Sequence, residues 1–227
     1  MEQLWNGYVL DIPDNVFPLS TDSMLLANFV RTGPQSKVLD LGAGCGTLGV
    51  LLCAHDPHCT VTGIEIDPAS HEAALENIRI NDLSSRMDCL LGDLRDNVAE
   101  PGSYHICVSN PPYFAAGPQS KTHSTARRED LCSAEDLFCA AGKALRYGGD
   151  FYLVHRPERL AHLCACGVNH QLELKRLCLV RHRADKPVSL ILMQFRKGGK
   201  PGLIWEECCL QDANGEPTDF YRQLYHL

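Results

Sequence analysis

The chain has 227 residues, of which 44% are hydrophobic and 22% charged, as expected for one globular domain with a well-buried core. No apolar run reaches the roughly 18 residues of a membrane span, and no basic and apolar leader marks secretion, so we expect a cytoplasmic protein without a membrane partner. The net charge of −7 argues against a uniformly nucleic-acid-binding surface, but residues 121–200 carry 15 Lys and Arg against 8 Asp and Glu.

The first half of the chain alternates short apolar runs with helical patterns. A short strand over residues 8–12 and a helix capped by Ser20 or Thr21 come first. Four strands are then predicted over residues 37–41, 60–65, 87–91 and 105–109, with helices over residues 47–54 and 68–81.

The second half begins with residues 113–133, which show no clear period and predict a long loop that carries function. The patterns that follow predict a helix over residues 134–146 ended by Gly148-Gly149, a strand over 151–155, and a helix over 157–166 ended by Gly167. Two extended runs, 172–182 and 188–196, flank a turn and predict an antiparallel hairpin. The whole order predicts a doubly wound, Rossmann-like α/β fold whose mostly parallel sheet ends in that hairpin.

The twelve cysteines do not have the spacing of a disulfide framework or a zinc site. Cys53, Cys89, Cys107 and Cys178 each lie inside an apolar run, where cysteine acts as a small hydrophobic residue. No CxxC pair is present, and the ten histidines lack a ligand spacing such as HExxH. We expect reduced, mostly buried thiols and no metal.

A glycine-rich segment, Asp40-Leu-Gly-Ala-Gly-Cys-Gly46, follows the 37–41 strand and opens a helix. Glycine lets the chain turn sharply and lets a ligand lie against the backbone. Glu65 ends the next strand, 19 residues after Gly46, where a carboxylate can accept hydrogen bonds from both ribose hydroxyls of an adenosine cofactor. NAD would use the same scaffold, so these residues leave the identity of the cofactor open.

The strand over residues 105–109 runs directly into Asn110-Pro111-Pro112-Tyr113. Two prolines fix the backbone and remove two N–H donors, which leaves the Asn110 side-chain oxygen and the Pro111 carbonyl as rigid acceptors. Two acceptors on the hydrogens of an exocyclic or carboxamide NH₂ favour its pyramidal, nucleophilic form. Tyr113 offers a ring on which a flat base can stack, worth about 1–3 kcal/mol. The tetrapeptide therefore predicts chemistry on an amino group.

These motifs resemble those of class I methyltransferases that act on amino groups. More closely, residues 17–28, the NPPY segment with Phe114, the Ala126–Glu129 segment and the Val154–Arg159 segment are similar to a bacterial family. It is the family of the tRNA1(Val) (adenine-N6)-methyltransferase, and the similarity covers nearly the whole chain. The resemblance implies N6-methylation of an adenine beside the anticodon of tRNA, with S-adenosylmethionine as the cofactor and no metal. It divides the chain into an N-terminal strand–helix extension, residues 1–36, and a class I methyltransferase domain, residues 37–227.

The resemblance also assigns site residues. It implies that Asp40, with Gly42, Gly44 and Gly46, lines the methionine part of the cofactor, that Glu65 holds the ribose, and that Asp93 and Leu94 contact the cofactor adenine. Asp22 is expected to reach the cofactor ammonium or to cap its helix. The residues expected at the target base are Asn110, Pro111 and Tyr113, and those expected to contact the substrate are Phe114, Lys121, Arg127 and Arg128.

The basic residues extend this expectation to an RNA surface. Arg127-Arg128-Glu129 stands where the family pattern has Arg-His-Glu, so this loop departs from the pattern. If the substrate is folded RNA, cations of the loop and the hairpin would neutralise phosphates. They are Lys121, Arg127, Arg128, Lys175, Arg176, Arg181, Arg183 and Lys186.

Other classes of function remain open beside adenine N6-methylation. The NPPY chemistry also fits another amino group, such as a protein glutamine carboxamide or a different RNA base. Glutamine methyltransferases of release factors usually carry a sizeable N-terminal helical domain, whereas only 36 residues precede the first strand of the main sheet here. A non-catalytic binding module would not need the glycine turn, the ribose carboxylate and NPPY together. Small-molecule substrates form the last alternative.

Overall fold

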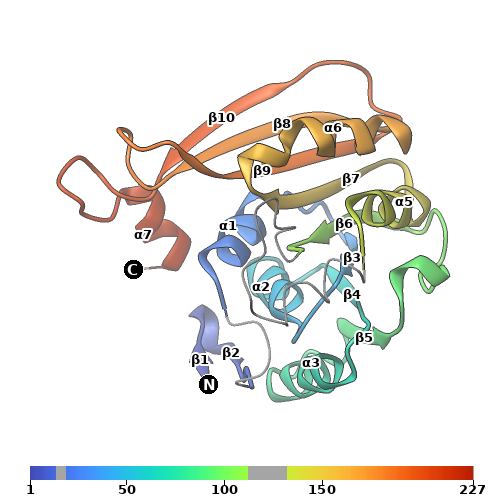
Figure 1. Ribbon diagram of the computed structural model, residues 1–227. Coiled ribbons are helices and arrows are strands. Elements are labelled where there is room, and N and C mark those ends of the chain that lie inside the picture. The colour runs from blue at the N-terminus through green and yellow to red at the C-terminus, as the bar shows by residue number, and fades with distance from the viewer. Residues whose placement is uncertain (14–18, 112–131, 227) are drawn as a thin grey trace, which may run out of the picture.

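A computed structural model describes residues 1–13, 19–111 and 132–226. An eight-stranded sheet runs through the molecule in the order β10-β8-β9-β7-β6-β3-β4-β5 (Figure 1). Its strands are β3 (Lys37–Leu41), β4 (Thr60–Glu65), β5 (Met87–Leu91), β6 (Tyr104–Ser109), β7 (Leu145–His155), β8 (Leu172–Arg181), β9 (Val188–Lys197) and β10 (Ile204–Cys209). Only β9 runs antiparallel to its neighbours, β7 and β8. The predicted doubly wound fold and its terminal hairpin are confirmed.

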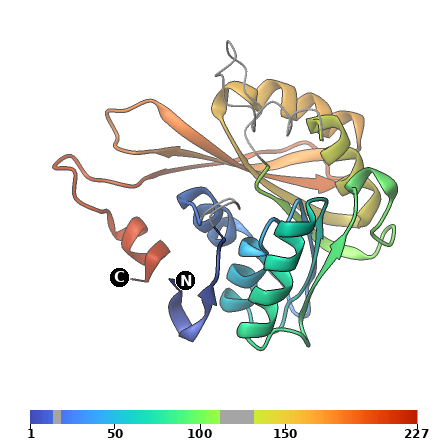
Figure 2. The ribbon, with the colours of Figure 1, turned by 60° about the horizontal axis from the view of Figure 1, so that its bottom comes forward.

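Helices cover both faces of the sheet, and its central strands bury both of their faces. Alternate residues of β3 show this, since Val38 belongs to one apolar cluster and Leu39 to the other. The first cluster includes α1 (Thr21–Phe29), α2 (Thr47–His55), α3 (Pro68–Ile80) and α7 (Asp219–Tyr225). The second includes α5 (Ala134–Ala144) and α6 (Leu160–Asn169). Figure 2 shows the gold α6 and the teal α3 on opposite sides of the sheet.

The N-terminal segment is fastened to α3 by two asparagines. It holds β1 (Glu2–Gln3), the short 3-10 helix η1 (Trp5–Gly7) and β2 (Val9–Leu10). The amide of the fully buried Asn77 bonds both the N–H and the carbonyl of Asp11 and also donates to the Cys45 carbonyl, at 2.7, 3.0 and 3.0 Å. Asn81 bonds the N–H and carbonyl of Val9 in the same way. The two side-chain amides thus bond backbone N–H and carbonyl groups that a neighbouring strand would otherwise bond. Asn77 also joins the segment to the glycine turn through the Cys45 carbonyl.

Three boundaries in the second half differ from the prediction. The helix α5 ends at Ala144, and β7 begins at Leu145 and continues through Gly148-Gly149, so these glycines lie inside a strand. The helix over 157–166 is split into η3 (Pro157–Arg159) and α6, which extends to Asn169 and includes Gly167. A Cβ on Gly167 would lie 2.7 Å from the Leu172 carbonyl and 2.8 Å from the Phe195 ring. This glycine therefore serves close packing and does not end the helix.

Two elements near the C-terminus were not predicted. β10 adds a parallel edge strand to β8, and α7 lies beside α1, as Figure 1 shows. All twelve cysteines are free thiols, and Cys53, Cys89, Cys107 and Cys178 are buried as expected. In the described ranges, no helix is long and apolar enough to cross a membrane.

Candidate functional site

The loops after four neighbouring parallel strands meet at one edge of the sheet. β3 pairs with β4 on one side and with β6 on the other, so the direction of winding reverses at β3. In open α/β sheets, ligands bind outside the carboxyl ends of the strands at such a reversal. The described site residues that end or follow these strands are Gly42, Gly44, Gly46, Glu65, Asp93 and Asn110.

The glycine turn between β3 and α2 has the shape expected of a cofactor loop. The N–H groups of Gly42 and Ala43 both donate to the Ile64 carbonyl at 3.0 Å, which fastens the turn to β4. Gly42 and Gly44 have φ values of 79° and 57°, and a Cβ at either position would stand in open space. Glycine is therefore needed for the left-handed backbone, and it leaves room for a ligand. Gly46 has the same left-handed backbone, with a φ of 79°, but a Cβ there would lie 3.0 Å from Met87, so this glycine also serves packing.

Glu65 lies at the end of β4 with its carboxylate turned to the glycine turn. Its Oε2 accepts the Gly44 N–H at 2.7 Å, and its Oε1 accepts the Asp67 N–H at 2.8 Å. Only 9% of Glu65 is exposed. Each oxygen keeps a lone pair, so the carboxylate can also accept from two ribose hydroxyls. The next residue, Ile66, is 41% exposed and offers apolar surface for a flat ring, a role that the sequence patterns did not predict.

Asp40 is the unusual group of this edge. It is 1% exposed, and neither of its carboxylate oxygens has a hydrogen-bond partner among the described residues. Burial, and then the neighbouring charge of Glu65, raises the pKa of Asp40 to about 8. A buried, unpaired carboxyl is costly unless a ligand satisfies it. An ammonium group such as that of the methionine moiety of S-adenosylmethionine fits this donor requirement.

Asp93 and Leu94 follow β5 and begin the 3-10 helix η2 (Leu94–Asp96). The Asp93 carboxylate accepts from the Arg95 backbone N–H at 2.9 Å and forms an ion pair with the Arg95 side chain. The hydrogen bonds from Arg95 hold the pKa of Asp93 below its usual range. Asp93 is therefore an ionised acceptor, the form that an adenine amino group needs.

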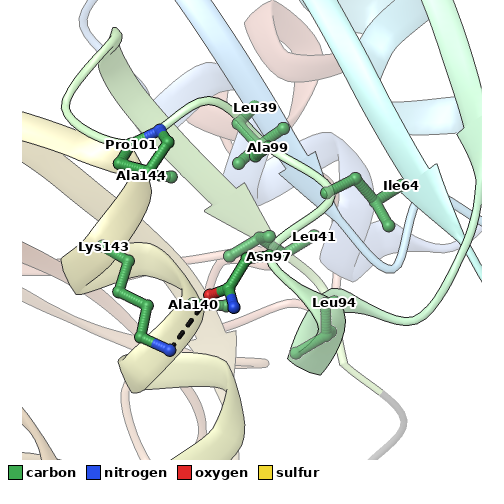
Figure 3. A pocket seen from close by; sticks show the side chains of 10 residues that line it. All are labelled: Leu39, Leu41, Ile64, Leu94, Asn97, Ala99, Pro101, Ala140, Lys143 and Ala144. Carbon is green, nitrogen blue, oxygen red and sulfur yellow. Dashed lines mark hydrogen bonds between the residues drawn. The ribbon is translucent and has the colours of Figure 1, made fainter.

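Leu94 lines a pocket of about 300 Å³, part of it open to solvent, between the sheet and α5 (Figure 3). Leu39, Leu41 and Ile64 form the wall on the sheet, and Lys143 of α5 donates to Asn97 Oδ1 at 3.0 Å on the opposite wall. Glu65 is not among the lining residues. The Leu94 side chain thus faces the apolar layer over α5, whereas Ile66 directly follows Glu65.

Asn110 directly follows β6, and Pro111 after it is buried. The end of the strand is fixed because the Ser109 hydroxyl donates to the Leu41 carbonyl at 2.7 Å. The Asn110 side-chain Nδ2 donates to Ser23 Oγ of α1 at 3.0 Å. This bond engages the NH₂ end of the amide and leaves Oδ1 as the end that can accept from a substrate.

The first turn of α1 also reaches this edge. Its cap is Ser20, whose Oγ accepts the Ser23 N–H, so the capping role considered for Asp22 belongs to Ser20. Burial raises the pKa of the Asp22 carboxyl, and the charge of Arg156 opposes that shift. Ser23 is a contact that the sequence patterns did not predict. Five predicted residues lie outside the described ranges, namely Tyr113, Phe114, Lys121, Arg127 and Arg128.

The basic residues of the hairpin fall into two groups. Arg176 is 6% exposed, pairs with Glu206 at 2.9 Å and donates to the Phe29 carbonyl, so the expectation that it contacts phosphate is wrong. Arg183 and Lys186 lie in the turn between β8 and β9. Because β8 runs parallel to β6, that turn is at the same edge of the sheet as Asn110. The distribution of charge along the sequence suggested that basic residues of the hairpin lie near the site. The sheet topology supports this for the turn that holds Arg183 and Lys186.

Comparison with known proteins identifies the family. The methyltransferase small domain profile matches residues 19–164. The chain belongs to the methyltransferase small domain family. Relatives include two proteins named tRNA1(Val) (adenine(37)-N6)-methyltransferase. That of Porphyromonas gingivalis is 30% identical over 78% of this chain and 74% of its own, and that of Edwardsiella ictaluri is 32% identical over 91% and 84%.

Solved structures agree on the fold of this methyltransferase. A predicted O-methyltransferase of Agrobacterium tumefaciens covers 91% of this chain and 96% of its own with a TM-score of 0.75 at 21% identity. A geranyl diphosphate methyltransferase in complex with S-adenosylmethionine covers 77% and 84% with a TM-score of 0.58 at 14% identity. The enzyme is a methyltransferase that uses S-adenosylmethionine. Within residues 1–13, 19–111 and 132–226, no group of three His, Cys, Asp or Glu side chains could hold a metal ion.

Proposed function

We propose that this methyltransferase transfers a methyl group from S-adenosylmethionine to N6 of an adenine in tRNA, beside the anticodon. The names of the relatives, which specify adenine 37 of tRNA1(Val), support the substrate. The NPPY segment supports an amino group as the acceptor. Both support the same reaction.

The observation that carries the proposal is the orientation of the Asn110 amide. Its Nδ2 is engaged by Ser23, so its Oδ1 is the atom available at the carboxyl end of β6, one strand from the glycine turn. The lone pair of an adenine amino group is delocalised into the ring. Oδ1 of Asn110 and the Pro111 carbonyl would accept the two N6 hydrogens and favour the pyramidal form, whose lone pair can attack.

S-adenosylmethionine supplies an electrophilic methyl group when it is bound. Transfer of this group to N6 would leave S-adenosylhomocysteine, and the proton lost by N6 would pass to water. Asn110 holds the amine toward the methyl group through this step, which is catalysis by orientation and by acceptance of developing positive charge. Tyr113 remains the predicted stacking surface for the flipped base.

For the cofactor, we propose the division of labour that the carboxylates suggest. Asp40 and the turn at Gly42, Gly44 and Gly46 take the methionine part, and Glu65 takes the ribose. Asp93 and the backbone of Leu94 take the adenine, with Ile66 as additional apolar surface. Asp22 lies at the methionine end, and residues 1–36 act as an extension of the domain formed by residues 37–227.

The proposal is tested with total tRNA from a strain that lacks this enzyme. Purified protein and S-adenosylmethionine should produce N6-methyladenosine in that tRNA, detected by mass spectrometry of its nucleosides. Asn110→Ala should lower turnover by about 100- to 1000-fold, the cost of one aligned polar group at a reacting centre. Affinity for S-adenosylhomocysteine should stay within about twofold, because Asn110 acts on the amine. If no RNA nucleoside is methylated but a glutamine-containing protein is, the carboxamide alternative replaces this one.

A further inference from the structure

The contact between Ser23 and Asn110 joins the N-terminal helix to the proposed reacting centre. Ser23 lies in the first turn of α1 and is 4% exposed, and its Oγ is 3.0 Å from Asn110 Nδ2 across 87 positions of sequence. We propose that Ser23 is a positioning residue that fixes which end of the Asn110 amide faces the substrate. This inference rests on the proposed function, because it assumes that Asn110 accepts from the target amine.

The hydrogen-bond pattern around Ser23 defines the direction of this contact. An amide nitrogen can only donate, so the Ser23 oxygen accepts from Asn110. The Ser23 and Ser20 hydroxyl oxygens lie 3.3 Å apart and can bond in either direction, and Ser20 Oγ also accepts the Ser23 backbone N–H. In the proposed arrangement, Ser23 donates its hydroxyl proton to Ser20. The chain of bonds therefore runs from Asn110 through Ser23 to the cap of α1.

The two ends of a primary amide have nearly the same shape, so packing alone does not distinguish them. A flipped Asn110 would present its NH₂ group where the adenine amino group needs an acceptor, and two donors would then face each other. When Ser20 accepts the Ser23 proton, as proposed, Ser23 satisfies the unflipped amide and not the flipped one. The helix α1 thus contributes to turnover and not only to the apolar layer beneath it.

The substitution Ser23→Ala removes the acceptor and leaves the backbone bond to Ser20 intact. With tRNA from the deficient strain as substrate, kcat should fall about 10- to 100-fold, the scale expected when a reacting group is misoriented. KM for tRNA and affinity for S-adenosylhomocysteine should change by less than about threefold. Ser23→Thr, which keeps a hydroxyl, should recover most of kcat. A merely structural role would not produce this separation of kcat from KM.

The control is Thr21→Ala, which removes a hydroxyl from the same helical turn, where Thr21 Oγ1 bonds the Tyr225 hydroxyl at 3.0 Å. Its turnover should match that of the wild type, and thermal melting of each variant excludes unfolding as the cause. If Ser23→Ala keeps turnover within twofold of an active wild type, Ser23 does not position Asn110.

A second measurement is independent of the substrate. In a ¹⁵N-labelled protein, the side-chain NH₂ resonance of Asn110, assigned by its loss in Asn110→Ala, should shift in Ser23→Ala and stay near its place in Ser23→Thr. If the wild type methylates no tRNA, the proposed function fails, but this resonance still shows whether Asn110 is hydrogen-bonded to Ser23. An unchanged resonance in Ser23→Ala overturns the inference.

Discussion

The two halves of the sheet use their charged side chains differently. In the cofactor half, β3 to β6, Asp40 is buried and has no hydrogen-bond partner among the described residues, and Glu65 accepts from the backbone N–H groups of Gly44 and Asp67. In the C-terminal half, β7 to β10, arginines form ion pairs with carboxylates of adjacent strands, as Arg196 does with Asp150 and Arg176 with Glu206. The Asp40 and Glu65 carboxylates are therefore available to ligands, whereas many charges of the second half hold strands together.

The largest effect should follow from breaking the buried pair of the C-terminal half. In Arg176→Met, the Glu206 carboxylate loses its bidentate partner, and the Phe29 carbonyl loses a donor. Loss of one partner from a buried pair costs about 3–5 kcal/mol, and we expect the lower end because Glu206 is 32% exposed and also lies 3.7 Å from Arg31. Urea unfolding measures this loss, and cofactor affinity of the folded protein should not change.

The matched control is Arg183→Gln, which breaks an arginine–carboxylate pair with Asp185 in the exposed turn. Its urea midpoint should equal that of the wild type, because water screens exposed pairs. Equal loss of stability in both variants would show that the division into ligand-binding and structural charges is wrong for this half.

Unlike Arg176→Met, Glu65→Ala should mainly lower the affinity for the cofactor. Buried ribose hydroxyls would lose a charged acceptor, so affinity for S-adenosylhomocysteine should weaken by about 1–3 kcal/mol in calorimetry. Glu65→Gln keeps one oxygen acceptor, so its affinity for S-adenosylhomocysteine should lie between those of the wild type and Glu65→Ala. NAD should not compete with S-adenosylhomocysteine. Tight binding of NAD to the wild type would contradict the assignment of this edge to a methyl donor.

Asp40 gives the cofactor half a dependence on pH. Its pKa of about 8 means that the ligand-free protein holds this carboxyl protonated at neutral pH. Pairing with an ammonium group requires the ionised form, so binding releases a proton and must strengthen as pH rises toward 8. The change is at most tenfold for each pH unit. Titration of S-adenosylhomocysteine between pH 6 and 8 measures it, and Asp40→Asn should flatten the profile. A flat profile in the wild type would refute the pairing.

The sequence was sufficient to predict the cofactor half because its signals are local. β3, β4 and β5 have the predicted bounds, since each is a short apolar run next to a turn. β10 could not be predicted in this way, because four of its six residues are charged or exposed, and two of them form ion pairs with Arg176 and Arg181 of β8. Ser23 was missed for the same reason, although a serine among buried residues of a helix is a signal that could have been used.

The smallest effect concerns RNA binding, where the C-terminal half has cations at the site edge. Arg183 and Lys186 lie in the turn at that edge, but both pair with Asp185, so each should contribute less than one full phosphate contact. Each neutralised phosphate contributes about 0.7–0.9 to the slope of log affinity against log salt. The double variant Arg183→Gln, Lys186→Gln should therefore lower the slope by about one, measured by tRNA binding with S-adenosylhomocysteine present.

Two further variants test whether the change in salt slope is specific to the turn between β8 and β9. Lys175→Gln removes a cation from the opposite half of β8, where its Nζ bonds the Lys200 carbonyl at 2.7 Å, and it should leave the slope unchanged. Arg127→Gln with Arg128→Gln should flatten the slope further, because the sequence predicts that their loop follows the reacting segment. Lys175→Gln could instead change the salt dependence of tRNA binding as much as the Arg183→Gln, Lys186→Gln variant. RNA would then contact both ends of β8 equally, and the site edge would not be the RNA surface. Negligible tRNA affinity even at low salt would contradict a nucleic-acid substrate. The charged residues at the site edge would then bind the cofactor alone.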